Sequence, residues 1–184
     1  TDAQNYSATI TPNAQGTTSP IAVSIVVNNG GYEDQAGNAS TADSNTFIWN
    51  ADSLGPTLQD VTGQQTTNDT TPDYQFTCDE ANCTIVAHTL GAGCDDLLNA
   101  AVANGNNTIT LGGNAPFAEG TYSGKTITVE DSVGNQTVLT IPDFVIDTTA
   151  PVFNALTPTA GTRINSSNFG YNLSEDIASG TYTF

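Results

Sequence analysis

Positive charge is nearly absent from this sequence. Its 184 residues include two basic ones, Lys125 and Arg163, against 19 acidic ones, and the formal net charge is −17. Such a surface repels phosphate groups, which argues against nucleic acid and anionic membrane surfaces as partners. Cations are the partners that this charge favours, although many of the carboxylates need only keep the chain soluble.

Long apolar runs and catalytic residue sets are missing as well. No run reaches the roughly 18 apolar residues of a membrane helix, so we expect a mature soluble segment with no anchor or membrane insertion. The chain has no Met and a single histidine, His88, and its composition is typical of exported, extracellular proteins. With one histidine, no nucleophile elbow around Ser123 and no phosphate-binding loop, the sequence predicts no enzyme.

A repeated acidic turn is what the chain has instead. The order of an acidic turn ending in Gly-Asn, an apolar strand and an Asp-x-x-x-Pro linker occurs twice, at residues 33–38, 47–49 and 52–56, and again at residues 130–135, 144–146 and 147–151. Gly and Asn tolerate the positive φ angles of tight turns. The duplication predicts tandem structural units.

Short alternating or β-branched segments predict strands along the whole chain. They lie at residues 6–11, 21–27, 47–49, 57–61, 74–78, 83–90, 107–111, 121–130, 136–147, 153–156, 169–176 and 182–184. We expect residues 21–27 to be buried on both sides, Trp49 to lie in the core, and residues 74–90 to form a hairpin. Residues 95–104 predict one or two helical turns that cross between sheets. The fold class is therefore all-β, an immunoglobulin-like sandwich.

Three motifs relate the chain to known repeats. They are Phe-x-Trp-x-x-Asp-x-x-x-Pro at residues 47–56, Gly-Thr-Tyr-Ser-x-x-Thr-Ile-Thr-Val-x-Asp-x-x-Gly-Asn at residues 120–135, and Leu-Ser-Glu-Asp-Ile-Ala-Ser-Gly-Thr at residues 173–181. The chain resembles the tandem bacterial immunoglobulin-like repeats of large surface adhesins and of extracellular stalk or filament proteins. The resemblance implies display at the cell surface, sandwich units joined end to end, and calcium at the junctions.

The proline-containing linkers divide the chain into three parts. Residues 56–150 are expected to form a complete Ig-like domain, residues 1–55 the C-terminal half of another, and residues 151–184 the N-terminal half of a third. Since neither half buries its apolar face alone, we expect the two ends to be complementary. Their partners are copies of the chain arranged head to tail, or adjoining repeats of the same polypeptide.

Acidic residues from three segments should meet at each junction, because turns at one pole of a sandwich lie together. Around Pro56 the predicted Ca²⁺ ligands are Asp52, Asp79, Glu80, Glu130, Asp131 and Asn135. Around Pro151 they are Asp147, Glu175 and Asp176, joined by Asp34 and Asn38 of the next copy. Ca²⁺ accepts six to eight such oxygen ligands. The alternative is that these residues are solvated and favour turns.

The cysteines leave several possibilities open. Cys78 and Cys83 flank a four-residue turn, and their positions favour a disulfide across the expected hairpin. Reduced core cysteines, or a bond to Cys94, are the alternatives. The spacing of these cysteines and His88 matches no zinc pattern.

The leading functional hypothesis is a structural segment of an adhesin, stalk or filament. The alternative is an adhesin module that binds glycans or a host surface. Such a module should carry aromatics on an exposed loop, and the irregular loops at residues 91–106 and 112–120 hold only Phe117.

Overall fold

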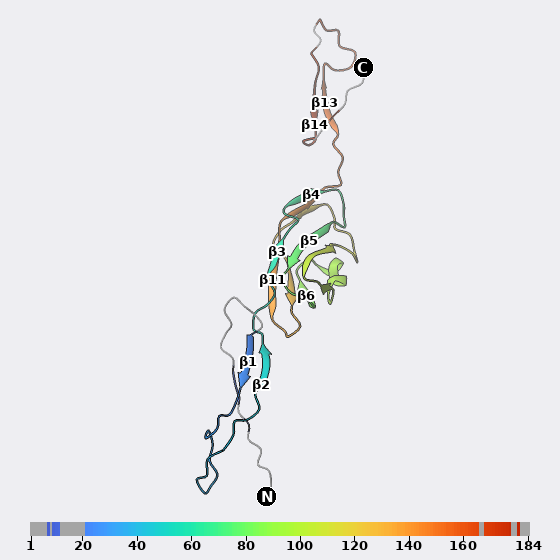
Figure 1. Ribbon diagram of the computed structural model, residues 1–184. Helices are drawn as coiled ribbons and strands as arrows, with labels where there is room; N and C mark the ends of the chain where they lie inside the picture. Colours follow the sequence, from blue (N-terminus) through green and yellow to red (C-terminus); the bar gives the residue numbers. More distant parts are fainter. Residues whose placement is uncertain (1–6, 8, 12–20, 166–167, 178–179, 181–184) are drawn as a thin grey trace.

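The computed structural model describes residues 7, 9–11, 21–165, 168–177 and 180. The described chain is extended: a central body lies between the β1–β2 hairpin at one end and the β13–β14 hairpin at the other (Figure 1). No helix among these residues is long and apolar enough to cross a bilayer.

The central body is a β-sandwich. One sheet has the order β3 (Leu58–Asp60), β5 (Asp73–Cys78) and β8 (Gly105–Thr110). The other has the order β11 (Gln136–Ile141), β10 (Lys125–Glu130), β6 (Cys83–His88) and β7 (Ala101–Val102). A further sheet, β4 (Gln65–Thr67), β12 (Phe144–Ile146) and β9 (Gly120–Tyr122), continues the second one, because β9 leads into β10 and β11 into β12.

Most strand pairs in the sandwich are antiparallel, whereas β4 and β12 run parallel, with Val145 opposite Thr66. The first strands of the body and its last strands are thereby joined at one edge. The alternation expected from the sequence fills the core: in β5 the side chains of Tyr74, Phe76 and Cys78 are buried and those between them are not. The predicted Ig-like sandwich is confirmed for this part of the chain.

The hairpin predicted over residues 74–90 is wrong. β5 pairs with β3 and β8, whereas β6 pairs with β10 and β7, so the turn between them carries the chain from one sheet to the other. Asn82 in that turn has a φ of 60°. Both arrangements bury the same alternate side chains, and this is why the local pattern did not distinguish them.

The helical turns begin earlier than predicted. A 3₁₀ helix, η1 (Ala92–Leu97), connects β6 to β7, and β7 occupies part of the stretch expected to be helical. Because β6 and β7 are neighbours in one sheet, the predicted crossing between the sheets is wrong. Cys94 and Leu97 are the buried residues of η1, so this helix packs on the core.

The β1–β2 hairpin pairs β1 (Ile21–Ile25) with β2 (Phe47–Ala51), which confirms both strands. The burial predicted for them is wrong: Ile21 is 44% exposed, and Trp49, expected in the core, is 38% exposed. Among the described residues, no second sheet packs against these side chains. The strand expected at residues 6–11 lies partly outside the described residues, and its described members form no strand.

The β13–β14 hairpin pairs β13 (Phe153–Thr157) with β14 (Gly170–Leu173), as the sequence predicted. The two rings of Phe153 and Tyr171 meet edge to face at 5.6 Å. The strand expected at residues 182–184 lies outside the described residues. The division of the chain into one complete and two partial domains stays a prediction.

Candidate metal centre

Three carboxylates converge at the end of the sandwich that faces the β1–β2 hairpin. Asp52 comes from the linker after β2, Glu80 from the turn between β5 and β6, and Asp131 from the turn between β10 and β11. One oxygen of each lies within 4.8 Å of the others, and Asp131 is buried while its two neighbours are partly buried. We call these three residues the junction cluster.

Asp131 is held in place as an anion by its own turn. Its Oδ1 accepts hydrogen bonds from the backbone N–H groups of Val133, Gly134 and Asn135 at 2.8, 2.8 and 2.9 Å, and its Oδ2 accepts the Asn135 amide at 2.8 Å. Burial raises the pKa of this carboxyl, but the hydrogen bonds from Asn135, Val133 and Gly134 outweigh it and hold the pKa below its ordinary value.

Glu80 experiences the opposite balance. Burial raises the pKa of its carboxyl above the ordinary value, and the negative charges of Asp52, Asp131 and Asp79 raise it further. A carboxylate next to two others at this separation is stabilised by any cation that enters. The donor set fits Ca²⁺, since three carboxylates from three segments offer hard oxygen ligands and water or backbone oxygens supply the remainder.

Close packing of the linker brings Asp52 to the cluster. A Cβ added at Gly55 would lie 2.6 Å from Thr137 Oγ1 and 2.8 Å from the Gln136 carbonyl oxygen, so only glycine fits against β11 here. Asp52 Oδ1 also accepts the backbone N–H of Leu54 at 3.2 Å. The linker and the sandwich therefore share one acidic site.

Of the six ligands predicted at this junction, the structure brings four together. Asn135 joins the three carboxylates through its bond to Asp131 and a 3.5 Å contact with Asp52. Asp79 instead accepts the backbone N–H of Thr57 at 2.6 Å. Glu130 accepts the side-chain amide of Gln136 at 2.6 Å. The last two carboxylates are thus used by the fold and lie outside the junction cluster.

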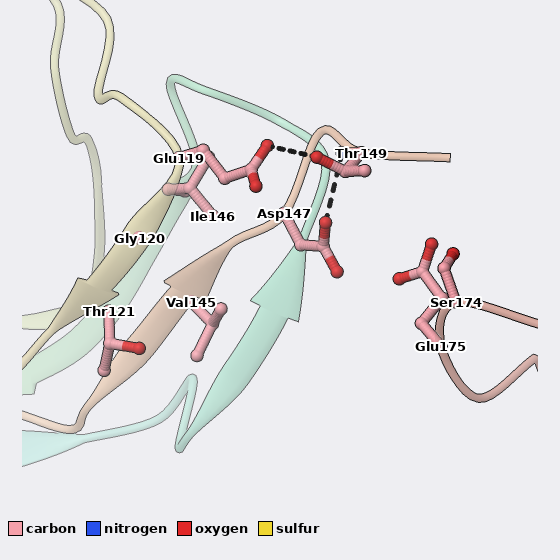
Figure 2. A pocket seen from close by; sticks show the side chains of 9 residues that line it. All are labelled: Glu119, Gly120, Thr121, Val145, Ile146, Asp147, Thr149, Ser174 and Glu175. Atoms are coloured by element: carbon pink, nitrogen blue, oxygen red, sulfur yellow. Dashed lines mark hydrogen bonds between the residues drawn. The ribbon is translucent and has the colours of Figure 1, made fainter. Parts of the chain in front are cut away.

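The second predicted site is at the other end of the sandwich. Asp147 and Glu175 line a cavity of about 350 Å³, together with Glu119 (Figure 2). Oε1 of Glu175 is buried without a hydrogen-bond partner. Asp176 lines a neighbouring cavity beside β14. The two chain segments on either side of Pro151 therefore both turn carboxylates toward one space.

Glu119 is the residue of this site that sequence reasoning missed. Its Oε2 accepts hydrogen bonds from the hydroxyls of Thr149 and Thr148 at 2.7 and 2.9 Å. These bonds hold the pKa of Glu119 below its ordinary value and tie the linker to the sandwich. No sequence signal marks this residue, because it lies in an irregular loop outside the repeated turns.

Asp34 and Asn38 lie in the segment between β1 and β2, beyond the opposite end of the sandwich from Asp147 (Figure 1). Their turn has the geometry of the Asp131 turn: Oδ1 of Asp34 accepts the N–H groups of Ala36 and Asn38 at 2.9 Å, and Oδ2 accepts the Asn38 amide at 2.8 Å. The Asn38 bonds hold the pKa of Asp34 below its ordinary value. Within one copy, this pair is apart from the Asp147 site.

The predicted Cys78–Cys83 disulfide is not formed in this structure. Both thiols are free and buried, with their Sγ atoms 4.0 Å apart. They approach each other from the two different sheets. Burial, followed by the proximity of Cys78, raises the pKa of the Cys83 thiol to about 12.

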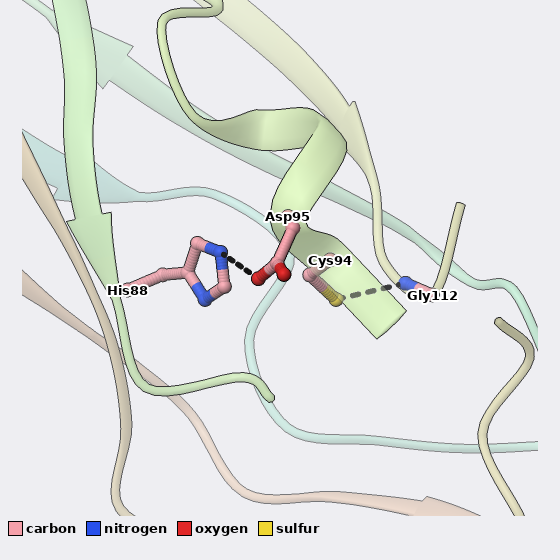
Figure 3. A network of polar contacts seen from close by, with 4 residues as sticks. All are labelled: His88, Cys94, Asp95 and Gly112. Atoms are coloured by element: carbon pink, nitrogen blue, oxygen red, sulfur yellow. Dashed lines mark hydrogen bonds and ion pairs between the residues drawn. The ribbon is translucent and has the colours of Figure 1, made fainter. Parts of the chain in front are cut away.

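Cys94 and His88 have buried side chains. The Cys94 sulfur accepts the backbone N–H of Gly112 at 3.0 Å, and Nε2 of His88 lies 3.6 Å from Asp95 Oδ1 (Figure 3). In the part of the chain that the structure describes, the junction cluster is the one group of His, Cys and acidic side chains close enough to share a metal ion.

Phe117 packs edge to face on Phe144 at 5.4 Å, so this loop aromatic is used inside the fold.

Two antiparallel sheets joined at one edge by a parallel pair define an immunoglobulin-like sandwich. The family model of the bacterial Ig-like domain matches residues 56–148, half of the 184-residue chain. The chain belongs to the bacterial Ig-like domain family, whose members are commonly surface or extracellular modules. No curated protein and no solved structure matched the chain.

Proposed function

We propose that this chain is a structural segment of an extracellular adhesin, stalk or filament, in which Ig-like units follow one another end to end and Ca²⁺ stiffens the junctions. The junction cluster is the observation that carries the proposal. One of its carboxylates belongs to the linker and two belong to the sandwich, so a cation held by all three fixes the angle between successive units.

Repeated hydrogen bonds support the succession of units. The backbone N–H of Ser174 donates to the carbonyl oxygen of Val152 at 2.9 Å. The same bond occurs 95 positions earlier, where the backbone N–H of Asp79 donates to the carbonyl oxygen of Thr57 at 3.2 Å. The Asp34 turn repeats the Asp131 turn in the same way. These repeated contacts support the proposal that each end of the chain is part of a further Ig-like unit.

Calcium binding by the intact chain tests the proposal. Titration calorimetry should detect Ca²⁺, and chelation should lower the melting temperature of the central sandwich. A ligand that binds only the folded state adds about 2.7 kcal/mol at a concentration 100 times its dissociation constant.

Two matched variants locate the site. Glu80→Gln should abolish the calcium effect, whereas Glu130→Gln, at the same pole but bonded to Gln136, should leave it unchanged. In chelator, Glu80→Gln should also stabilise the fold at neutral pH. Because burial and the neighbouring carboxylates raise the folded-state pKa of Glu80, its ionisation destabilises the fold progressively as pH rises above the unfolded-state value of about 4.3. Equal calcium responses in both variants, or none in the original chain, would contradict the proposed site.

A ligand-binding adhesin module is less well supported. Phe117, the only aromatic residue of the irregular loops, packs against Phe144 and Tyr122. The loops therefore lack the exposed aromatic anchor that binding sites favour. Extended fibres in electron micrographs of the native material would agree with the structural role, and glycan binding by the chain would favour the adhesin role.

A further inference from the structure

The β1–β2 hairpin reproduces the last strands of the central sandwich. Ile25 pairs with Phe47 in the hairpin, and Tyr122 pairs with Phe144 in the sandwich, each residue lying 97 positions later than its counterpart. β1 therefore corresponds to β9, and β2 corresponds to β12. The agreement in register shows that the hairpin has the same backbone pairing as β9 and β12.

The β13–β14 hairpin reproduces the first strands of the sandwich in the same manner. Phe153 pairs with Leu173, and 95 positions earlier Leu58 pairs with Cys78. A bulge after Phe153 then shifts the rest of the ladder. β13 therefore corresponds to β3, and β14 corresponds to β5.

The central sandwich shows how these two sets of strands fit together. They meet where β4 runs parallel to β12, with Val145 opposite Thr66, and this contact helps to bury Phe144 to 1% exposure. After the bulge the spacing on the β13 side is 96 rather than 95, so the pair corresponds to Ile48 of β2 opposite Thr162 of a β13–β14 segment.

In the terminal hairpins the matching side chains are uncovered. Phe47, the counterpart of the buried Phe144, is 67% exposed, and Phe153 is 62% exposed. Within the described residues, β2 has β1 as its one neighbour in a two-stranded sheet. An apolar face next to an open strand edge is a surface that strand addition covers.

We infer that this face of the β1–β2 hairpin binds the β13–β14 segment of a second copy of the chain, residues 151–165 and 168–177, with the stretch that follows β13 added as a parallel strand beside Phe47, Ile48 and Trp49. In a single copy this stretch forms a turn, in which the N–H of Thr162 donates to the carbonyl oxygen of Thr159 at 3.1 Å, so it extends on binding. The partner is identified by register, because the β13–β14 segment has the strand pairing that covers the same face in the central sandwich. The chain's own β13–β14 hairpin lies at the opposite end of the sandwich (Figure 1). A contact between two different surfaces that does not close produces linear polymers.

Charge sets a condition on this contact, and here the inference rests on the proposed function. Joining the halves brings Asp34 of one copy to Asp147 and Glu175 of the other, which are the counterparts of the junction cluster. With a net charge of −17 on each copy, association should need Ca²⁺ or salt. Chelation at low salt is therefore expected to return the polymers to single copies.

Analytical ultracentrifugation of the intact chain in Ca²⁺ tests the inference with two single variants. Trp49→Asp removes the accepting face, and Phe153→Asp removes the inserting hairpin. Each variant alone should raise the dissociation constant of self-association at least about tenfold, as loss of an interface anchor does.

Mixed together, the two variants should form one-to-one dimers and nothing longer. The Trp49→Asp copy keeps its inserting hairpin and the Phe153→Asp copy keeps its accepting face, so only one contact can form. Val138→Asp, a substitution of a side chain that is 61% exposed on the central sandwich, should polymerise like the original chain.

The outcomes separate the inference from the proposed function. A chain that stays a single copy over the whole concentration series in Ca²⁺ overturns the inference, and its halves are then completed by other segments of the polypeptide. Association that survives both variants, or a mixture that forms no dimers, overturns it too. Calcium binding at Glu80 is measured on single copies, so the proposed function stands or fails independently. Unchanged melting of the central sandwich verifies that each variant is folded.

Discussion

Asn135 donates its side-chain amide to Oδ2 of Asp131 at 2.8 Å, while its backbone N–H donates to Oδ1 of the same carboxylate at 2.9 Å. One asparagine thus engages both oxygens of a buried anion at the edge of the candidate metal centre. Hydrogen bonds to the charged form lower a carboxyl pKa, and this stabilises the fold while the group is ionised.

An Asn135→Ala variant should therefore be less stable than the original chain at neutral pH, and the difference should shrink in acid. The stabilisation from Asp131 is complete above the unfolded-state pKa of about 3.9, and it is lost as pH falls through the lower folded-state value. Without the amide, the folded-state pKa lies closer to the unfolded-state value, so less stabilisation is present at neutral pH and less is lost in acid. Urea midpoints between about pH 2 and 7 measure the difference. Asn38→Ala, in the matching turn outside the sandwich, should leave the midpoint unchanged at every pH.

Phe144 and Phe47 occupy corresponding positions with opposite environments. Phe144→Ala should destabilise the central sandwich by about 3 to 5 kcal/mol, since it removes a ring stacked on Tyr122 in a filled core. Phe47→Ala should change the same transition by less than about 0.5 kcal/mol. Denaturant unfolding of single copies compares the two, and a large cost at Phe47 would mean that its hairpin packs on the sandwich.

Thiol counting decides the state of the Cys78–Cys83 pair. We expect oxidising conditions to reduce the number of titratable thiols in the unfolded chain from three to one. A loop this short gains about 2 kcal/mol by the chain-entropy relation. Cys94→Ser should leave the oxidised pair intact, whereas three reactive thiols after oxidation would show that no bond forms.

Glu119→Ala should loosen the linker without unfolding the sandwich. The variant removes both hydroxyl contacts to Thr148 and Thr149, and Glu119 itself is exposed. Backbone NMR order parameters of residues 148–150 should fall, while the melting temperature of the sandwich changes little. Thr121→Ala, at the same cavity but without a contact to the linker, is the control. Unchanged order parameters would mean that other contacts hold the linker.

The sequence predicts local features of this chain better than the pairing of distant strands. The acidic turns and the alternation in β5 depend on near neighbours, and both are found where expected. The partner of β6 depends on where β10 lies, so residues 74–90 alone fit a hairpin and a crossover equally well. Glu119 joins the linker through contacts about 30 positions away, which no motif records.

The parallel pairing of β4 with β12 determines how the module responds to tension. The chain enters the sandwich after β2 and leaves it toward β13 at the opposite end (Figure 1), so a pull on the two ends drags these strands in opposite directions along their axes. Their backbone hydrogen bonds are then loaded in shear and must break together rather than one at a time. The β4–β12 pair, which joins the first and last strands of the sandwich, is therefore also the contact that resists pulling on the two ends.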